Sequence, residues 1–148
     1  MLSNSCKYAI RATIYIQLNS DNNTRNVGIK EISKELELPS PFLGKILLNM
    51  AKHNILLSTK GPKGGFLLAR PAKEITLYDI IILFDGQHLF EKCLIGISTC
   101  SPYLHDKVQC PIHKSYLPIS LQLQELFKSQ TIEILAKEIE LAVGKIGL

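Results

Sequence analysis

Three cysteines and one histidine lie close together in the second half of the chain, and their types and spacing suit a metal centre. They are Cys93, Cys100, Cys110 and His113. Thiolates together with an imidazole are ligands that iron–sulfur clusters and zinc ions accept. The intervals between these residues are longer than in a standard zinc finger, whose cysteines pair at short spacing. The residues therefore indicate an iron–sulfur cluster or a zinc site, and the alternative is a set of free thiols in a loop.

The compartment expected for the chain bears on how these thiols are used. Residues 1–7 do not follow the plan of a signal peptide. No stretch of about 18 apolar residues is free of charges and helix breakers, so no membrane span is expected. We therefore expect a cytoplasmic protein, whose clustered cysteines bind a metal or react with oxidants rather than form disulfides. The remaining cysteine, Cys6, starts an amphipathic segment and is interpreted as a small buried residue.

Apolar periodicity before the cysteines predicts three helices joined by short turns. Pro39 disfavours helix in the residue before it and so separates the second helix from the third. Ser40 is expected to cap the third helix, and Pro41 suits its first position because that position needs no N–H. Two helices around such a tight turn are typical of a helix-turn-helix. The expected ranges are 5–19, about 29–37 and 41–54.

A β-hairpin is predicted directly after the third helix. Two short apolar runs, 55–59 and 66–69, flank a turn of glycines, lysines and a proline at 60–65. A hairpin in this position is the wing of a winged helix-turn-helix. Thr76 is expected to cap one more helix, over 77–84. The predicted fold class is therefore mainly α with a small β-hairpin.

The outer side of the third helix and the tip of the wing carry side chains that can contact DNA. The major groove admits an α-helix, on which lysine can bond guanine, asparagine can pair with adenine, and serine can contact bases or phosphates. Lysines beside glycines at a wing tip suit phosphates or the minor groove. The net charge of +4 is mild, so the positions of the charges matter more than their sum. The candidate DNA-binding residues are Ser40, Pro41, Lys45, Asn49 and Lys52 on the third helix, Lys60 and Lys63 on the wing, and Lys7 and Arg11 on the first helix.

Two other classes of function are weighed against DNA binding. Helix-turn-helix folds also mediate protein contacts, so a winged-helix protein-interaction module is the alternative binding function. An enzyme is not expected, because the sequence holds no nucleophile elbow, P-loop or HExxH motif. The glycines at 61, 64 and 65 lie in a hairpin and do not open a helix, so they are not a dinucleotide fingerprint.

The cysteine-rich segment separates the winged helix from a helical C-terminal part. Residues 87–114 show little periodicity, and a bound ion or cluster could organise them. The helix pattern returns over 115–148, where an apolar stripe with little chain left to cover it favours packing against a partner subunit. We therefore predict a winged helix-turn-helix over 1–86, a cysteine-rich sensing loop over 87–114, and a dimerisation helix with a C-terminal helix over 115–148. The stripe consists of Leu123, Leu126, Phe127, Ile134, Leu135 and Ile139.

Nearly the whole chain resembles one known family, the Rrf2 family of IscR- and NsrR-type regulators. The C-terminal end of the resemblance is the CPIH run, which closes a three-cysteine loop. The paired glycines of the wing followed by that loop make the combination specific. The matching runs are KYAIRA at 7–12, PSPFLGKIL at 39–47, STKGPKGGFLLAR at 58–70, ITLYDI at 75–80 and CPIH at 110–113.

The resemblance implies a homodimer joined through a long C-terminal helix, with one winged helix per subunit on a pseudo-palindromic double-stranded DNA operator. In cluster-binding members three cysteines of the loop hold a 2Fe–2S or 4Fe–4S centre, and the fourth ligand varies. By position the three are Cys93, Cys100 and Cys110, and His113 matches the histidine of the C-x-x-H arrangement. Such members sense cluster supply, nitric oxide or redox state.

The chain departs from the family in the length of its cysteine loop. The gaps between its cysteines exceed the roughly five intervening residues usual in the cluster sensors. A longer loop can still close on one centre, because closure entropy grows slowly with length. The cluster type and the fourth ligand therefore stay open. The alternative within regulation is a zinc-bound or metal-free member that responds to oxidants through its thiols, or to metabolites.

Overall fold

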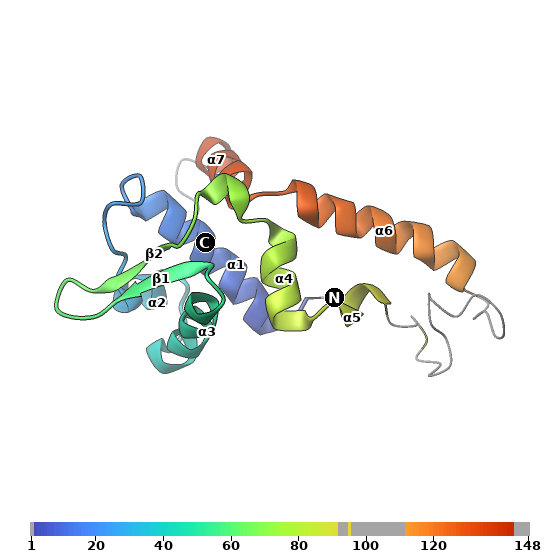
Figure 1. Cartoon of the computed structure of the whole chain (residues 1–148). Helices are drawn as coiled ribbons and strands as arrows, with labels where there is room; N and C mark the ends of the chain where they lie inside the picture. Colours follow the sequence, from blue (N-terminus) through green and yellow to red (C-terminus); the bar gives the residue numbers. More distant parts are fainter. Residues whose placement is uncertain (1, 92–94, 96–111, 144–148) are drawn as a thin grey trace.

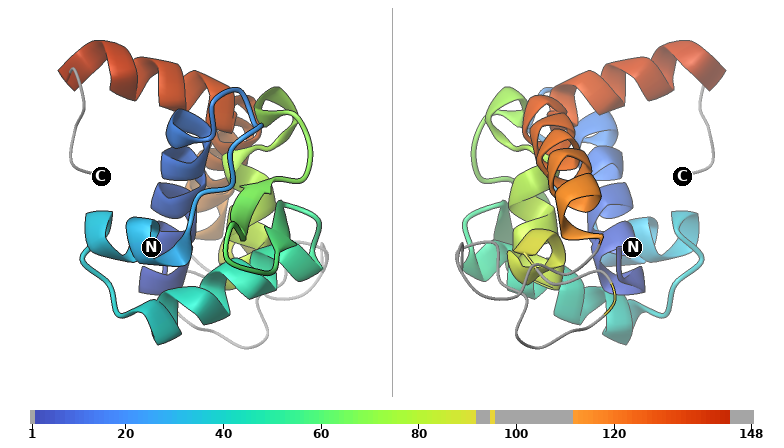
Figure 2. Two further views of the ribbon diagram at one scale, coloured as in Figure 1. Left: turned by 90° about the vertical axis from the view of Figure 1, so that its left-hand side faces the viewer. Right: turned by 90° about the vertical axis from the view of Figure 1, so that its right-hand side faces the viewer.

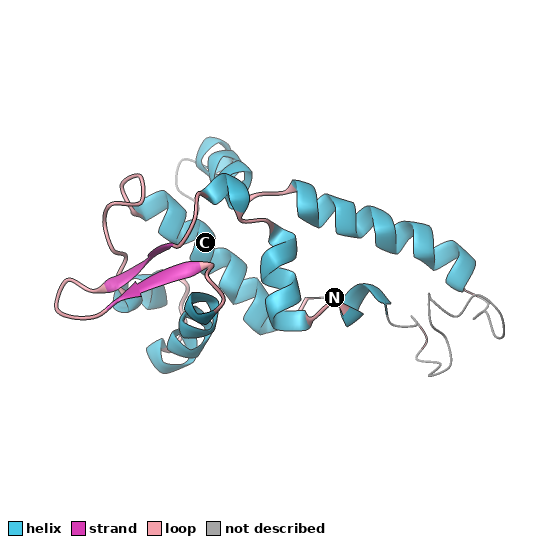
Figure 3. Ribbon diagram, viewed as in Figure 1, coloured by secondary structure: helices cyan, strands magenta, loops and turns pink. Residues whose placement is uncertain are grey.

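The computed structural model describes residues 2–91, 95 and 112–143 and consists of helices with one antiparallel hairpin at one side (Figure 3). This confirms the predicted mainly helical class with a small hairpin. Among the described residues, no helix combines the length and the apolar character needed to cross a bilayer. The elements are α1 (Asn4–Asn19), α2 (Ile29–Glu35), α3 (Ser40–Lys52), β1 (Leu56–Thr59), β2 (Gly65–Leu68), the 3-10 turn η1 (Ala72–Glu74), α4 (Leu77–Asp85), α5 (His88–Glu91), α6 (His113–Ser129) and α7 (Ile132–Val143).

Helix α1 is the central element of the core. It contacts α2, α3, α4, α7 and β2, so that the winged helix and the C-terminal helix share one apolar interior (Figures 1 and 2). Ser3 caps α1 by accepting a hydrogen bond from the backbone N–H of Cys6 at 3.1 Å. Ala9 and Ala12 are fully buried, and their small side chains allow neighbouring elements to approach closely.

The turn between α2 and α3 spans residues 36–39, because α2 ends at Glu35, two residues before its predicted end, and α3 starts one residue earlier than predicted. Glu37 has a positive φ of 52° and Pro39 occupies the N-cap position, so α3 begins at Ser40. The predicted capping role of Ser40 is wrong, because its hydroxyl donates to the Ser33 hydroxyl at 2.9 Å and caps no backbone N–H of α3. The Ser33 hydroxyl in turn donates to the carbonyl of Leu38. The hydrogen bonds from Ser40 to Ser33 and from Ser33 to Leu38 thus close the turn, and no side chain caps the start of α3.

The predicted wing is confirmed as the β1–β2 hairpin, with Leu56 opposite Leu68 and Thr59 opposite Gly65. The base of the wing is attached to the segment before α2. Val27 and Phe66 exchange two backbone hydrogen bonds, of 3.0 and 2.9 Å. Gly65 permits this attachment, because a Cβ there would lie 2.5 Å from the Val27 carbonyl oxygen. The wing is therefore held on two sides rather than standing free.

The loop between α1 and α2 adds a second attachment for the wing. Asp21, Asn22 and Asn23 have φ values of 47°, 57° and 64°, a conformation that Asp and Asn tolerate better than most residues. The Asn23 side chain donates to the Leu68 carbonyl at 3.1 Å and accepts from the Leu68 N–H at 2.9 Å. One amide side chain therefore pairs with the end of β2 as a neighbouring strand would.

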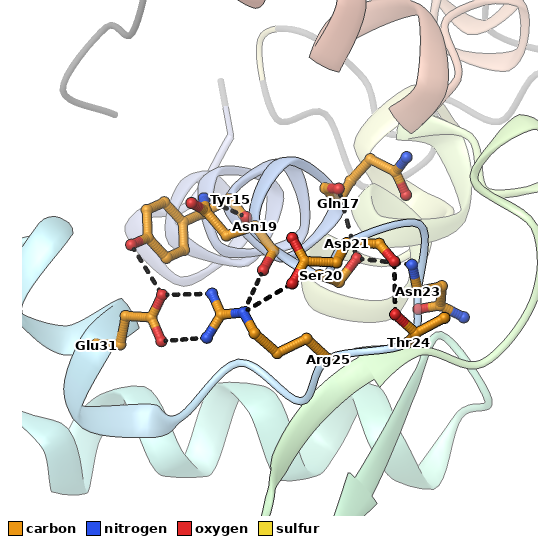
Figure 4. A network of polar contacts seen from close by, with 9 residues as sticks. All are labelled: Tyr15, Gln17, Asn19, Ser20, Asp21, Asn23, Thr24, Arg25 and Glu31. Carbon is orange, nitrogen blue, oxygen red and sulfur yellow. Dashed lines mark hydrogen bonds and ion pairs between the residues drawn. The ribbon is translucent and has the colours of Figure 1, made fainter.

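Arg25 holds the same loop against α2 (Figure 4). Its guanidinium donates to both carboxylate oxygens of Glu31, at 2.9 and 3.2 Å, and to the Asn19 carbonyl at 3.0 Å. The hydrogen bond from Arg25 is the main reason that the pKa of Glu31 lies below its ordinary value. The Tyr15 hydroxyl donates to Glu31 as well, at 3.4 Å. Arg25 is thus engaged at the surface of the protein, where it joins α1 to α2.

The chain returns to the core after α6. Backbone hydrogen bonds of 2.9 Å join Leu77 to Gln130 and Ile132 to Ile75, so the connection before α7 pairs with the segment before α4. Ile132 is fully buried and Ala136 is 4% exposed, which places α7 on the winged-helix core beside α1. Helix α6 itself runs outward from this core as a long arm (Figure 1).

We expect Asn23→Ala to destabilise the protein by about 1–3 kcal/mol, because two backbone groups at the end of β2 lose their partner. The measurement is urea denaturation followed by circular dichroism. Asn22→Ala is the matched control, because Asn22 has a similar positive φ and makes no side-chain hydrogen bond within the described part of the chain. Equal losses of stability in the two variants would show that the hydrogen bonds to Leu68 contribute nothing.

Candidate nucleic-acid interface

Helix α3 is amphipathic, and its apolar side is packed into the core. Leu43, Leu47 and Met50 are fully buried, and Ile46 is 4% exposed. These positions recur at three- and four-residue intervals, which places them on one side of the helix. The apolar stripe predicted from the sequence is therefore confirmed, and it determines which side of α3 faces outward.

The opposite side of α3 carries most of the residues predicted to contact DNA. Pro41, Lys45 and Lys52 are exposed, and Asn49 is half-buried. The spacing of these four residues places them on one side of the helix. Ser40 is also half-buried at the start of α3, with its hydroxyl engaged by Ser33. The structure thus gathers the four outward residues along one helical side, with Ser40 at its N-terminal end.

The wing tip lies beside this side of α3 and presents two lysines. Lys60 and Lys63 are exposed in the loop between the strands. A turn with a hydrogen bond from the Gly64 N–H to the Gly61 carbonyl, at 2.9 Å, shapes the loop. The Asn26 amide donates to the Lys63 carbonyl at 3.2 Å and attaches the tip to the segment before α2. These two hydrogen bonds therefore hold the loop that carries Lys60 and Lys63.

The predicted contact residues of α1 lie near the beginning of α3. Lys7 is exposed, and the Arg11 guanidinium sits 5.9 Å from the centre of the Tyr8 ring. The Tyr8 ring in turn packs edge-on against Phe42 of α3, with 6.0 Å between ring centres. Aromatic packing thus connects the start of α1 to the start of α3 and places Arg11 next to it.

The segment that forms α3 and the wing carries basic but no acidic side chains. Residues 38–73, which include all of α3 and the wing, contain no aspartate or glutamate. The range therefore holds basic residues alone, although the whole chain carries only +4. The basic residues of the range are Lys45, Lys52, Lys60, Lys63, Arg70 and Lys73.

An apolar groove of about 300 Å³ separates α3 from the wing. Gly44 and Leu48 of α3 line it, together with Ile29 of α2 and Phe66 of β2. Leu48 is 51% exposed. The groove was not predicted from the sequence, in which a leucine directly after the buried Leu47 is the available signal.

The second predicted site, the metal centre, lies mostly outside the described residues. Cys93, Cys100 and Cys110 fall there, and His113 is the first residue of α6. Within the described ranges, no three His, Cys, Asp or Glu side chains come together as metal ligands. Cys6 is fully buried, as predicted. Burial, followed by the nearby Asp85 carboxylate, raises the pKa of its thiol to about 12 and keeps the thiol protonated.

The helices on either side of the cysteine segment are packed together. Phe90 of α5 lies 5.7 Å from Tyr78 of α4 and 6.1 Å from Phe127 of α6, measured between ring centres. The buried Ser120 hydroxyl of α6 donates to the Phe90 carbonyl at 2.9 Å. The chain therefore enters the cysteine segment from a helix that is anchored to both α4 and α6.

The predicted C-terminal stripe is divided between the core and the surface. Phe127 packs inward against Phe90, whereas Leu123 and Leu126 are 38% and 50% exposed. Ile119, four residues before Leu123, is 59% exposed. These three exposed side chains follow helical spacing, so α6 presents an apolar line that the described residues of one chain leave uncovered.

Comparison with known proteins supplies the family. The sequence profile of the Rrf2 family, described as an iron-dependent transcriptional regulator, matches residues 2–138. A candidate HTH-type transcriptional regulator of Aquifex aeolicus is 36% identical over 133 residues, which is 90% of this chain and 89% of that protein. The regulator IscR of Cereibacter sphaeroides is 29% identical over 80 residues, covering 54% of this chain and 52% of IscR.

Solved structures of similar fold belong to the same class of protein. CymR, the global cysteine regulator of B. subtilis, superposes with a TM-score of 0.73 at 20% identity, covering 93% of this chain and 97% of CymR. IscR of T. potens superposes with the same TM-score at 22% identity, covering 97% of this chain and 90% of IscR. The proteins named here are regulators rather than enzymes, which agrees with the prediction that the chain is not an enzyme.

The outward side of α3, the supported wing and the profile match over residues 2–138 lead to one conclusion. This chain belongs to the Rrf2 family of winged-helix transcriptional regulators.

Proposed function

We propose that two copies of this chain bind one DNA duplex through α3 and the wing, and that an iron–sulfur cluster held by the cysteine segment regulates the binding. The observation that carries the DNA-binding part is the surface formed by α3 and the wing, which contains basic residues and no acidic residue over 38–73. DNA carries one negative charge per phosphate, so a surface with basic and no acidic residues attracts it.

The roles of the residues follow from their positions. Helix α3 enters the major groove, where Lys45 bonds guanine and Asn49 pairs with adenine. Lys60 and Lys63 at the wing tip reach phosphates or the adjacent minor groove. The remaining candidates contact the DNA backbone around the start of α3 or along its outer side. They are Lys7, Arg11, Ser40, Pro41 and Lys52.

Cys93, Cys100 and Cys110 would hold the cluster, with His113 as the fourth ligand. Three thiolates and an imidazole form a donor set that suits iron–sulfur centres, and IscR and NsrR regulators are among the relatives. When bound, such a centre supplies a group that reacts with oxidants and nitric oxide. The chain would transmit a change at the cluster to α6, because α5 leads into the cysteine segment and is packed on α6 through Phe90 and Ser120.

Helix α6 would join the two subunits in the cytoplasm. Its exposed line of Ile119, Leu123 and Leu126 is the apolar surface that a second copy would cover. The two α3 helices of a dimer bind two half-sites at a distance that the arrangement of the subunits sets. A structural change in the cysteine segment next to α6 would alter that distance and so alter how well both α3 helices fit the duplex.

We expect Lys63→Glu to weaken binding to a duplex by about ten-fold and to reduce the slope of log affinity against log salt by about one, because a phosphate contact is lost. Lys137→Glu, which makes the same charge change on α7 and outside the range 38–73, is the control. The measurement is fluorescence anisotropy of a labelled duplex at several salt concentrations. Binding that is insensitive both to salt and to Lys63→Glu would favour a protein-interaction module.

We expect Leu123→Glu to convert the protein from dimer to monomer at micromolar concentration, because burying the new charge in an apolar interface costs several kcal/mol. Sedimentation velocity measures the change. Gln122→Glu adds the same charge at the neighbouring exposed position and should leave the dimer intact. A Leu123→Glu protein that sediments as the wild type does would remove α6 from the proposed interface.

We expect protein purified without oxygen to contain iron and sulfide and to absorb visible light. Alanine substitutions of Cys93, Cys100 or Cys110 should each remove the iron, whereas Cys6→Ala should retain it because Cys6 is buried in the core. Iron and sulfide analysis with absorbance spectroscopy makes the measurement. A colourless wild type after reconstitution contradicts the cluster, and zinc found by elemental analysis would replace it with the zinc-bound alternative.

A further inference from the structure

The groove between α3 and the wing presents apolar groups next to basic residues. Its α3 side, which we call the floor, consists of the backbone at Gly44 and the side chain of Leu48, which lie one helical turn apart. Lys45 follows Gly44 directly in the sequence, and Lys60 lies between two wing residues that line the groove, Thr59 and Gly61. Apolar groups with lysines next to them suit a polyanion that also carries apolar groups.

Gly44 lines the groove, and packing inside the protein does not by itself require glycine at this position. Glycine in the interior of a helix weakens that helix relative to alanine. A Cβ at Gly44 would meet only the tip of the Ile29 side chain, at 3.3 Å, so the fold itself could accommodate alanine with a small shift. The bare backbone at Gly44 therefore leaves room for a group that approaches α3 from outside.

We infer that this groove receives the C5-methyl group of a thymine, which makes Leu48 a specificity-determining residue of the interface. The inference rests on the proposed DNA binding through α3. A phosphate does not suit the floor, because Leu48 offers no hydrogen-bond donor and the helix backbone at Gly44 is already hydrogen-bonded within α3. The hydroxyls of Ser58 and Thr59 lie on the β1 side of the groove and can contact the sugar–phosphate backbone.

The methyl group identifies the base pair. In the major groove only thymine carries a methyl on its outer edge, and side chains read it through apolar contact. Lys45 and Asn49, on either side of Leu48 in the sequence, can form hydrogen bonds with neighbouring base pairs. The half-site is therefore expected to contain an A·T pair where Leu48 meets the groove, next to positions read by hydrogen bonds.

The test removes only the methyl group. A duplex is first selected from a randomised library with the full-length wild-type protein, and each thymine is then replaced in turn by deoxyuridine. We expect one or two replacements in each half-site to weaken wild-type binding by about four-fold, the equivalent of burying one methyl group. Against Leu48→Ala, the same replacements should have no effect on the dissociation constant.

Leu57→Ala is the matched control. Leu57 has the same 51% exposure as Leu48, lies on β1, and does not line the groove. The Leu57→Ala protein should distinguish thymine from deoxyuridine as the wild type does. Circular dichroism of all three proteins should be the same, because both leucines are half-exposed.

Three results would overturn the inference. In the first, wild type binds the selected duplex but no deoxyuridine replacement weakens binding. In the second, the replacements weaken binding equally in wild type and Leu48→Ala. In the third, no duplex is enriched from the library at low salt, and this result alone would also remove the proposed DNA-binding function.

Discussion

The burial of one side of α3 is the constraint on which the outward-facing surface depends. Leu43, Leu47 and Met50 are fully buried, and removing one such side chain from a core costs about 2–5 kcal/mol. A rotation of α3 about its axis would expose all three, so the helix has one stable orientation. That orientation sends Lys45 and Leu48 outward, and the chemistry of the surface follows from the packing beneath it.

The wing is held in a definite position relative to α3. Two backbone hydrogen bonds from Val27 and two side-chain hydrogen bonds from Asn23 attach β2 to the loop before α2, and Arg25 holds that loop against Glu31. A supported wing loses little conformational freedom when it meets a ligand, so more of its contact energy appears as affinity. The groove lined by Leu48 is stable for the same reason.

The winged helix and α6 are connected through packed side chains. Arg70, shortly after β2, forms an ion pair of 3.1 Å with Asp79, which also belongs to the capping box of α4. The next contacts run from Tyr78 of α4 through Phe90 of α5 to α6. The segment that carries the cysteines follows α5 directly, so it joins this connection between the wing and the proposed dimer helix.

Elements with local signals can be predicted from the residues alone. The stripe of α3, the hairpin and the Thr76 cap of α4 were predicted because periodicity, glycines and caps act within a few residues. Contacts between distant segments, such as the pairing of Asn23 with Leu68 and the packing of α7 on α1, became visible with the folded chain. The fold also corrected the local expectation for Ser40, whose hydroxyl meets Ser33 from the preceding helix. The groove at Leu48 was not predicted, because its walls come from α2, α3 and both strands of the wing, and no local sequence pattern shows which elements meet.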